Sequence, residues 1–198
     1  MFNMIDSELV KEAFNGYLTI SDELSAELSK IAVICRFGKN EKIYLRGSVA
    51  DSVAVVREGL VRSFILSGDK EMTIWFGEPG DFITSFYSFF TGKEGLETID
   101  CIEDTSVLMI PVTAIRALMK ENREMLFLYS VILEKSYMYW EDRYIVNQIH
   151  ESEERYAHFY NRGKSTILKI PLKILSSYLN IRQETLSRIR KRWLKQDR

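Results

Sequence analysis

The sequence predicts an α+β fold: an N-terminal antiparallel β-roll of the jelly-roll kind, then a long central helix, then a C-terminal helix-turn-helix. Three observations predict it. Short alternating or β-branched runs separated by turn clusters fill residues 32–111. An apolar spacing of three to four residues then continues through residues 112–149. Two short amphipathic segments on either side of Asn180 complete the pattern.

The first thirty residues predict short helices. Ser21 can cap a turn that begins with two acidic residues, and Leu24, Leu28 and Ile31 space one apolar face. Strand-like runs such as AVICRF, SVAVVREG and LVRSFIL then alternate with the turn clusters GKNEK, SGDK and GEPGD. This rhythm predicts a sandwich or barrel. The segment SFYSFFTGKEG, residues 85–95, is too aromatic for a solvent loop and predicts a short helix.

The helical pattern over residues 112–149 is long and apolar enough to bury more than one face. One face can cover the β-region, and the other favours a partner helix from a second copy of the chain. The alternative is a helix buried within a monomer, because Lys135 and Asp142 interrupt the heptad. The residues expected at the interface between two copies are Leu128, Val131, Ile132, Met138 and Ile145.

Near the C-terminus the pattern indicates two short helices joined by a tight turn. Pro171 suits a first turn, and the apolar positions of IPLKILSSYL fall on one face. Asn180 tolerates left-handed backbone, and Ile181 can fill the corner behind it. A helix, a tight turn, a buried Ile and a second helix are typical of a helix-turn-helix.

The second of these helices carries side chains suited to the major groove of DNA. Gln183 and Arg188 can each form two hydrogen bonds with a base edge, and Glu184 can accept one from cytosine. A solvated basic helix is the plain alternative. The residues expected to contact phosphates are Arg182, Thr185, Ser187, Arg190, Lys191 and Arg192.

The charge distribution agrees with this hypothesis. The whole chain has a net charge of −1, but residues 150–198 carry +7 and residues 1–149 carry −8. A basic end on an acidic body favours a polyanionic partner.

Other classes of protein fit the sequence less well. Two cysteines without a CxxC pair build neither a disulfide framework nor a four-cysteine cluster, and we expect no metal and no cofactor. A metal-dependent enzyme of the cupin kind would need histidines on strands, whereas His150 and His158 lie on the helical segment. We expect no enzyme activity. Neither a signal peptide nor a membrane span is apparent, so we expect a cytoplasmic protein without a membrane partner.

With these residues in view, the sequence resembles the cyclic-AMP receptor / fumarate-nitrate regulator (Crp/Fnr) superfamily of bacterial transcription factors. RQETLSRIRKR resembles the family's recognition helix, and GDFI at residues 80–83 resembles the entry to its effector cassette. The resemblance implies an effector-type β-roll over residues 1–111, a dimerisation helix over 112–149 and a DNA-binding domain over 150–198. It also implies double-stranded DNA, a second copy of the chain and RNA polymerase as partners. The operator would be palindromic.

The cassette departs from the family's nucleotide-binding pattern. Thr84 and Ser85 stand where such members have Gly-Glu, and Gly95 and Leu96 stand where an arginine should hold the cyclic phosphate. A cyclic phosphate buried without a cation is costly, so we expect no cyclic AMP binding.

The same region is rich in aromatic residues. It either binds an unidentified apolar or aromatic effector or is filled by its own side chains, and we favour the second interpretation. A ligand-sensing or interaction module whose helix-turn-helix does not read DNA stays open as a further alternative. The candidate pocket residues are Phe82, Ser85, Phe86, Tyr87, Leu96 and Trp140.

Overall fold

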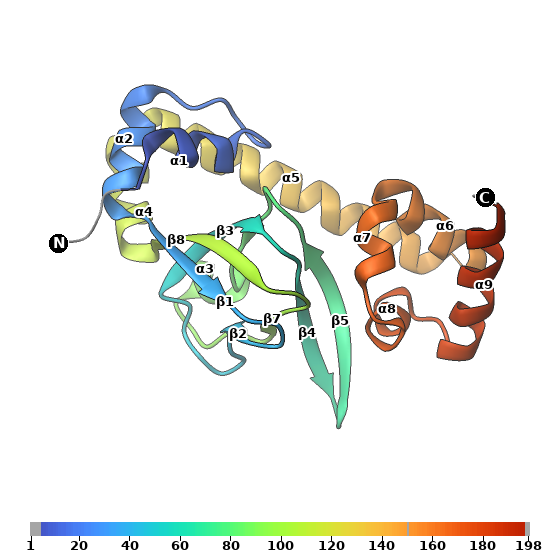
Figure 1. Cartoon of the computed structure of the whole chain (residues 1–198). Coiled ribbons are helices and arrows are strands. Elements are labelled where there is room, and N and C mark those ends of the chain that lie inside the picture. The colour runs from blue at the N-terminus through green and yellow to red at the C-terminus, as the bar shows by residue number, and fades with distance from the viewer. Residues whose placement is uncertain (1–4, 150, 197–198) are drawn as a thin grey trace. The chain divides into compact units, whose positions relative to one another are not determined.

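The computed structural model describes residues 5–149 and 151–196 of the chain. They form two compact units, the first from residues 5–65 and 75–135, and the second from residues 66–74, 136–149 and 151–196. The first unit contains most of the β-structure and the second contains the C-terminal helices (Figure 1). The expected α+β fold class is confirmed, whereas the division into functional parts at residues 111 and 149 stays a prediction.

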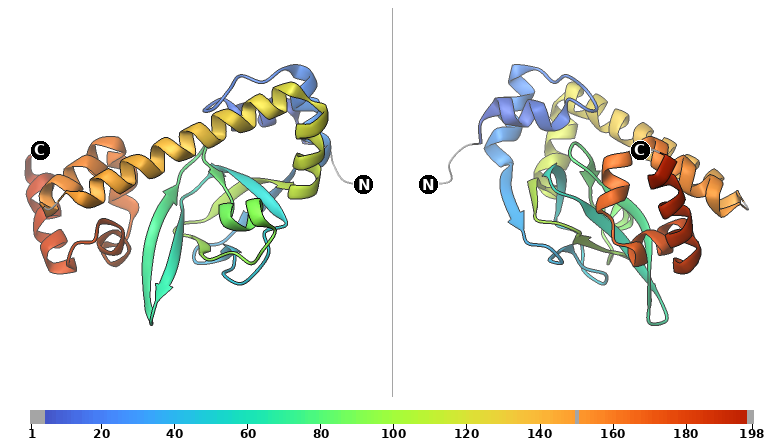
Figure 2. Two further views of the ribbon diagram at one scale, coloured as in Figure 1. Left: turned by 180° about the vertical axis from the view of Figure 1, so that it is seen from behind. Right: turned by 45° about the vertical axis from the view of Figure 1, so that its right-hand side comes forward.

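Two short helices open the first unit, α1 (Ser7–Phe14) and α2 (Asp22–Ile31). The hydroxyl of Ser21 accepts a hydrogen bond from the backbone N–H of Leu24 at 3.1 Å, which confirms the predicted cap. The apolar faces of both helices pack into one core with the N-terminal part of the long helix α5 (Arg123–Gln148) (Figure 2).

Eight antiparallel strands among the described residues form two four-stranded sheets, with strand orders β1-β8-β3-β6 and β2-β7-β4-β5. The central strand β3 pairs with β8 on one side and with β6 on the other, so its run SVAVV is buried along its whole length. This arrangement confirms the predicted β-roll. The strands are β1 (Val33–Phe37), β2 (Lys42–Tyr44), β3 (Ser52–Glu58), β4 (Val61–Ser67), β5 (Lys70–Gly77), β6 (Phe82–Ile83), β7 (Thr98–Cys101) and β8 (Thr105–Pro111).

The predicted short helix within the aromatic segment is present as α3 (Phe86–Thr91). It ends at Gly92, whose φ of 68° places it in the left-handed region that glycine tolerates. The N–H of Gly92 donates to the carbonyl of Ser88 and closes the last turn.

The helical stretch expected over residues 112–149 is not one helix, and this expectation is corrected. It consists of α4 (Val112–Glu121) and α5 (Arg123–Gln148), which are separated at Asn122. Asn122 has extended backbone, and its side-chain oxygen accepts from the N–H of Met125 at 3.0 Å. An asparagine that caps the second helix explains the break, because the cap replaces backbone bonds that a continuous helix would make.

The buried face of α5 differs from the expected one. Leu128 and Ile132 were expected between two copies, but they lie 0% and 1% exposed in the core of their own chain, so their assignment to a dimer interface is wrong. Val131 is half-buried, while Met138 and Ile145 are exposed. The large exposed apolar side chains of α5 are Leu126, Phe127, Tyr137, Met138, Trp140, Tyr144 and Ile145.

The second unit contains α6 (Ser152–Arg162), α7 (Lys164–Lys169), α8 (Leu172–Leu179) and α9 (Gln183–Gln196). Its interior holds fully buried apolar side chains from each of these helices, among them Tyr156, Ile167, Leu175 and Leu186. Within residues 5–149 and 151–196, no helix combines the length and the apolar character that a membrane span requires.

Candidate nucleic-acid interface

The turn between α8 and α9 has the predicted geometry. Asn180 has φ 52° and ψ 48°, and its N–H donates to the carbonyl of Ser176. Ile181 follows it with 7% of its surface exposed, and its own N–H donates to the same carbonyl at 3.1 Å. A residue in the left-handed conformation after a helix turns the chain sharply. It lets the following N–H groups donate to the last carbonyls of the helix. The predicted roles of Asn180 and Ile181 in this turn are confirmed.

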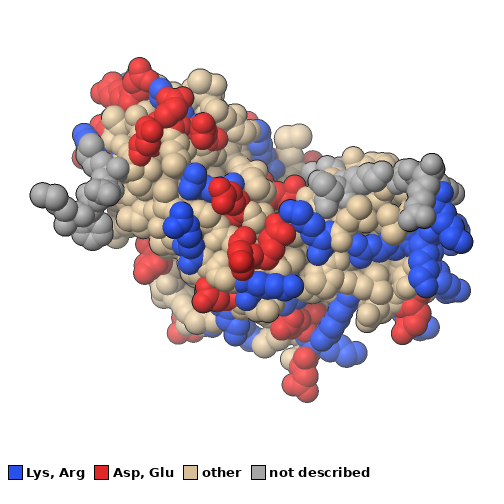
Figure 3. Space-filling view, viewed as in Figure 1, with Lys and Arg blue, Asp and Glu red and all other residues tan. Residues whose placement is uncertain are grey.

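The helix α9 has one buried face and one charged face. Leu186 and Ile189 are 0% and 3% exposed and fix the helix against the rest of the unit. Lysine and arginine side chains gather over α9 in Figure 3. The predicted contact residues that are exposed are Arg182, Gln183, Glu184, Arg188, Lys191 and Arg192. Together they give the exposed surface of α9, and the residue before it, a polar and mostly basic character.

The remaining candidate phosphate residues are more engaged with the protein itself. Thr185 and Ser187 are half-buried. Arg190 donates to the carbonyls of Leu168, at 2.6 Å, and Ile170, at 3.4 Å, so it links α9 to the end of α7. Its role toward phosphate stays a prediction, and its contacts assign it a structural role as well.

An aromatic cluster packs α9 against α6. The indole of Trp193 lies edge-on to Tyr156 and Tyr160, with ring centroids 5.6 and 5.1 Å apart. Its N–H donates to the carboxylate of Glu153, which also pairs with Arg192 at 3.0 Å. These contacts join α9 to α6, and sequence reasoning had not assigned them.

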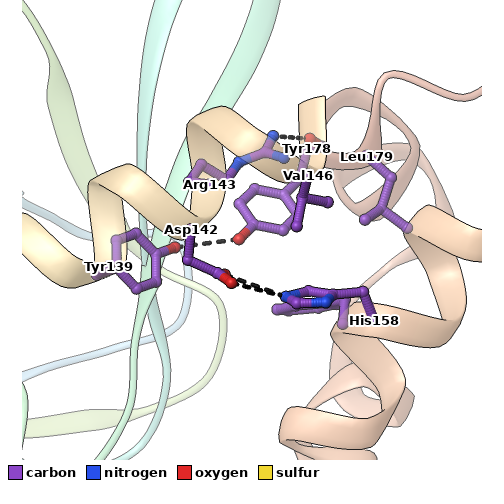
Figure 4. A pocket seen from close by; sticks show the side chains of 8 residues that line it. Tyr139, Asp142, Arg143, Val146, His158, Tyr178 and Leu179 are labelled. Atoms are coloured by element: carbon purple, nitrogen blue, oxygen red, sulfur yellow. Dashed lines mark hydrogen bonds and ion pairs between the residues drawn. The ribbon is translucent and has the colours of Figure 1, made fainter. Parts of the chain in front are cut away.

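A small cavity lies where α5, α6 and α8 meet (Figure 4). Its polar contacts are a 3.0 Å contact between Nε2 of His158 and the carboxylate of Asp142, and a 3.1 Å hydrogen bond between the hydroxyls of Tyr139 and Tyr178. Its volume of about 30 Å³ suffices for one or two water molecules. The cavity is therefore a packing feature between helices and too small for a metabolite.

In the β-roll, the candidate pocket residues are placed differently from one another. Phe82 and Ser85 are buried, Phe86 is half-buried, and Tyr87 and Leu96 are exposed. The rings of Phe82 and Phe86 lie 6.2 Å apart, and those of Phe86 and Phe90 lie 5.9 Å apart and stack. The aromatic side chains thus pack on one another, as the self-filled interpretation expects. Trp140 belongs to the second unit, so its part in a pocket stays a prediction.

Tyr17 hydrogen-bonds to the start of strand β6, next to this aromatic region. Its hydroxyl accepts from the N–H of Phe82 at 2.9 Å, and burial raises the pKa of Tyr17 to about 12. Beside it, burial raises the pKa of Asp81 to about 6, although the N–H of Glu78 donates to that carboxylate at 2.8 Å. Neutral groups are favoured here because the site is poorly solvated.

Two arginines of the first unit have partners within the protein. Arg116 donates to the carbonyl of Phe89 and lies over its ring, with the guanidinium carbon 5.1 Å from the centroid. Arg62 pairs with Asp100 through two hydrogen bonds, at 2.8 and 3.0 Å. Both guanidinium groups therefore already bond to groups of the protein and would have to give up these bonds to bind a phosphate.

The chain thus carries a helix-turn-helix after a β-roll. Residues 34–122 match the family described as cyclic nucleotide-binding domain. They are a cyclic nucleotide-binding-like domain, and the chain has the fold of Crp/Fnr family regulators. A comparison with curated proteins found no match.

Solved structures agree over most of the chain. FixK2 from Bradyrhizobium japonicum is 22% identical with a TM-score of 0.74, and the match covers 84% of this chain and 86% of that one. A putative Crp/Fnr-family transcriptional regulator from Eubacterium rectale is 17% identical, with a TM-score of 0.70 and coverage of 89% and 85%. A mutant of CooA from Carboxydothermus hydrogenoformans is 17% identical, with a TM-score of 0.67 and coverage of 84% and 78%.

Proposed function

We propose that this chain is a bacterial transcription regulator that binds a palindromic DNA operator as a homodimer. The observation that carries the proposal is the exposure of Gln183, Glu184 and Arg188 at the start of α9, directly after the turn at Asn180. The first residues of a recognition helix are those that reach base edges in the major groove. Glutamine and arginine there offer paired hydrogen bonds to adenine and guanine. We expect no enzymatic activity.

The homodimer is supported by the exposed side of α5. Tyr137 and Tyr144 are 68% and 69% exposed, and they lie on the face opposite to the buried Leu128. Met138 and Ile145 extend this apolar strip. A second copy of α5 would cover it in a symmetric contact. Two recognition helices related by a two-fold axis then meet half-sites centred about 34 Å apart.

The β-roll is proposed not to bind cyclic AMP. Support comes from Ser85 and Gly95, which replace the expected ribose and phosphate contacts, and from the protein partners that engage Arg62 and Arg116. A buried cyclic phosphate needs a cation to offset its desolvation. RNA polymerase is the expected protein partner, and the cytoplasm is the expected location.

The test is selection of bound sequences from randomised duplexes with the purified chain at about 150 mM salt, where sequence-independent binding is weak. Recovery of an inverted repeat with half-sites one helical turn apart is the expected result. Binding that is equally strong on all sequences and disappears with salt would overturn the proposal, because it would leave only backbone contacts.

A further inference from the structure

Three consecutive carbonyls at the end of α8 receive hydrogen bonds from two arginines of other helices. Arg143, on α5, donates to the carbonyl of Tyr178, and its guanidinium carbon lies 3.8 Å from the centroid of that ring. Arg155, on α6, donates from Nε to the carbonyl of Leu179 at 2.9 Å and from Nη2 to that of Asn180 at 3.0 Å. Side chains of α5 and α6 therefore hydrogen-bond to the turn of the helix-turn-helix.

The guanidinium of Arg155 also reaches the end of α5. Its Nη1 donates to the carbonyl of Ile149 at 2.5 Å, one residue beyond the last residue of that helix. The residue is 8% exposed, so water does not readily replace these bonds. One buried side chain thus ties the end of the long helix to the end of α8.

The chemistry of these contacts favours a fixed angle. The last carbonyls of a helix lack partners within the helix and carry partial negative charge, so a cation there is stabilising. An arginine has its donors in a rigid planar fork, whereas a lysine has a single rotatable ammonium. Three directed bonds from one fork restrict both the distance and the direction between the elements that they join.

We propose that Arg155, assisted by Arg143, is a positioning residue that sets the direction of the recognition helix α9 relative to the C-terminal part of α5. The helix α9 begins at Gln183, three residues after Asn180, so its direction follows from the turn that the arginines hold. This inference deepens the proposed function and rests on it: with two copies joined along α5, the clamp sets the separation of the two recognition helices.

The DNA experiment separates positioning from folding. Affinity is measured for a duplex with two half-sites and for one with a single half-site, with the parent chain and with Arg155→Lys and Arg143→Lys. Two-site binding gains from effective concentration only if the geometry lets both modules engage, so the lysine variants lose about tenfold or more on the full site. On the single half-site they stay within about twofold of the parent, because one module still docks.

Arg116→Met is the matched control, because it removes another arginine-to-carbonyl contact, with Phe89, in the other unit. It leaves the ratio of full-site to half-site affinity unchanged. Equal losses of Arg155→Lys on both duplexes would overturn the inference in favour of a purely structural role. Full retention of affinity on both duplexes would overturn it as well.

A second measurement needs no DNA. Spin labels at Tyr144→Cys on α5 and Leu194→Cys on α9, with Cys35 and Cys101 replaced by alanine, report the distance within one chain when diluted with unlabelled protein. Both labelled side chains are exposed. The expected result is one narrow distribution that broadens or shifts in Arg155→Lys and in Arg143→Lys. An unchanged distance distribution in the lysine variants would contradict the clamp. A parent chain that selects no operator would contradict the proposed function alone, so the two failures can be told apart.

Discussion

The hydroxyl of Ser85 lies only 2.8 Å from the point that a Cβ on Gly95 would occupy. Ser85 is 3% exposed, so a side chain at position 95 would not fit beside it without movement. In this chain, the positions that the resemblance assigns to ribose and phosphate contacts are thus close neighbours. They offer neither a carboxylate nor a guanidinium.

Because these two positions offer neither group, we expect no binding of cyclic AMP or cyclic GMP. Calorimetric titration of the purified chain gives no heat beyond dilution, and the nucleotides do not raise the melting temperature, since only a ligand of the folded state stabilises it. Saturable binding of either nucleotide, with a matching rise in melting temperature, would show that the aromatic packing opens for a cyclic phosphate after all.

A charge on the exposed face of α5 is expected to separate the dimer. Tyr144→Glu places a carboxylate in the strip that a second copy would cover, and burying an unpaired charge is strongly unfavourable. Light scattering coupled to gel filtration gives a monomer for this variant and a dimer for the parent. Met72→Glu is the control, because Met72 is also exposed but lies on β5. A dimeric Tyr144→Glu variant would place the interface elsewhere.

Arg190 and Lys191 are neighbours in sequence but are expected to act differently. Arg190→Ala removes the hydrogen bonds to Leu168 and Ile170 and lowers the free energy of unfolding by about 1 kcal/mol or more. Lys191→Ala leaves stability unchanged, weakens binding to all DNA sequences alike, and reduces the salt dependence by about one phosphate contact. Denaturant unfolding and salt-dependent anisotropy distinguish the two. A stable Arg190→Ala chain would contradict the structural role.

Asp81 is expected to make the stability of the chain depend on pH. Burial raises its pKa to about 6, so the folded state retains a proton that the unfolded state has released. The free energy of unfolding therefore falls as the pH rises through the window between the unfolded pKa and the folded one. Between about pH 5 and about pH 7 this group contributes a loss of about 1 kcal/mol.

The comparison for Asp81 is Asp81→Asn, whose side-chain oxygen can still accept from the N–H of Glu78. Its stability relative to the parent rises over the same pH interval, as measured by denaturant unfolding at both ends. A difference between the two chains that does not change with pH would show that the carboxylate is ionised in the folded state throughout this interval.

Local rules in the sequence predicted several features well. The left-handed Asn180, the buried Ile181 and the cap at Ser21 depend on residues within a few positions of one another. The β-roll likewise followed from short apolar runs and turn clusters. These features were predictable because their physical causes are local.

Features that depend on distant partners were not predictable in the same way. Helical periodicity marked Leu128 and Ile132 as apolar but could not tell whether their own core or a second copy covers them. Apolar spacing also passes through Asn122, so the break there was hidden. No pattern singled out Arg155, because its partners at residues 179 and 180 are set by tertiary packing.

The most direct measurement of the central claim is selection from randomised duplexes with the parent and Arg188→Ala chains in parallel at about 150 mM salt. If α9 reads bases, both chains recover the same inverted repeat, and the variant loses preference at one position in each half-site at a cost of about 1–3 kcal/mol per contact. An identical motif from both chains, with equal losses on cognate and scrambled DNA, would contradict the account.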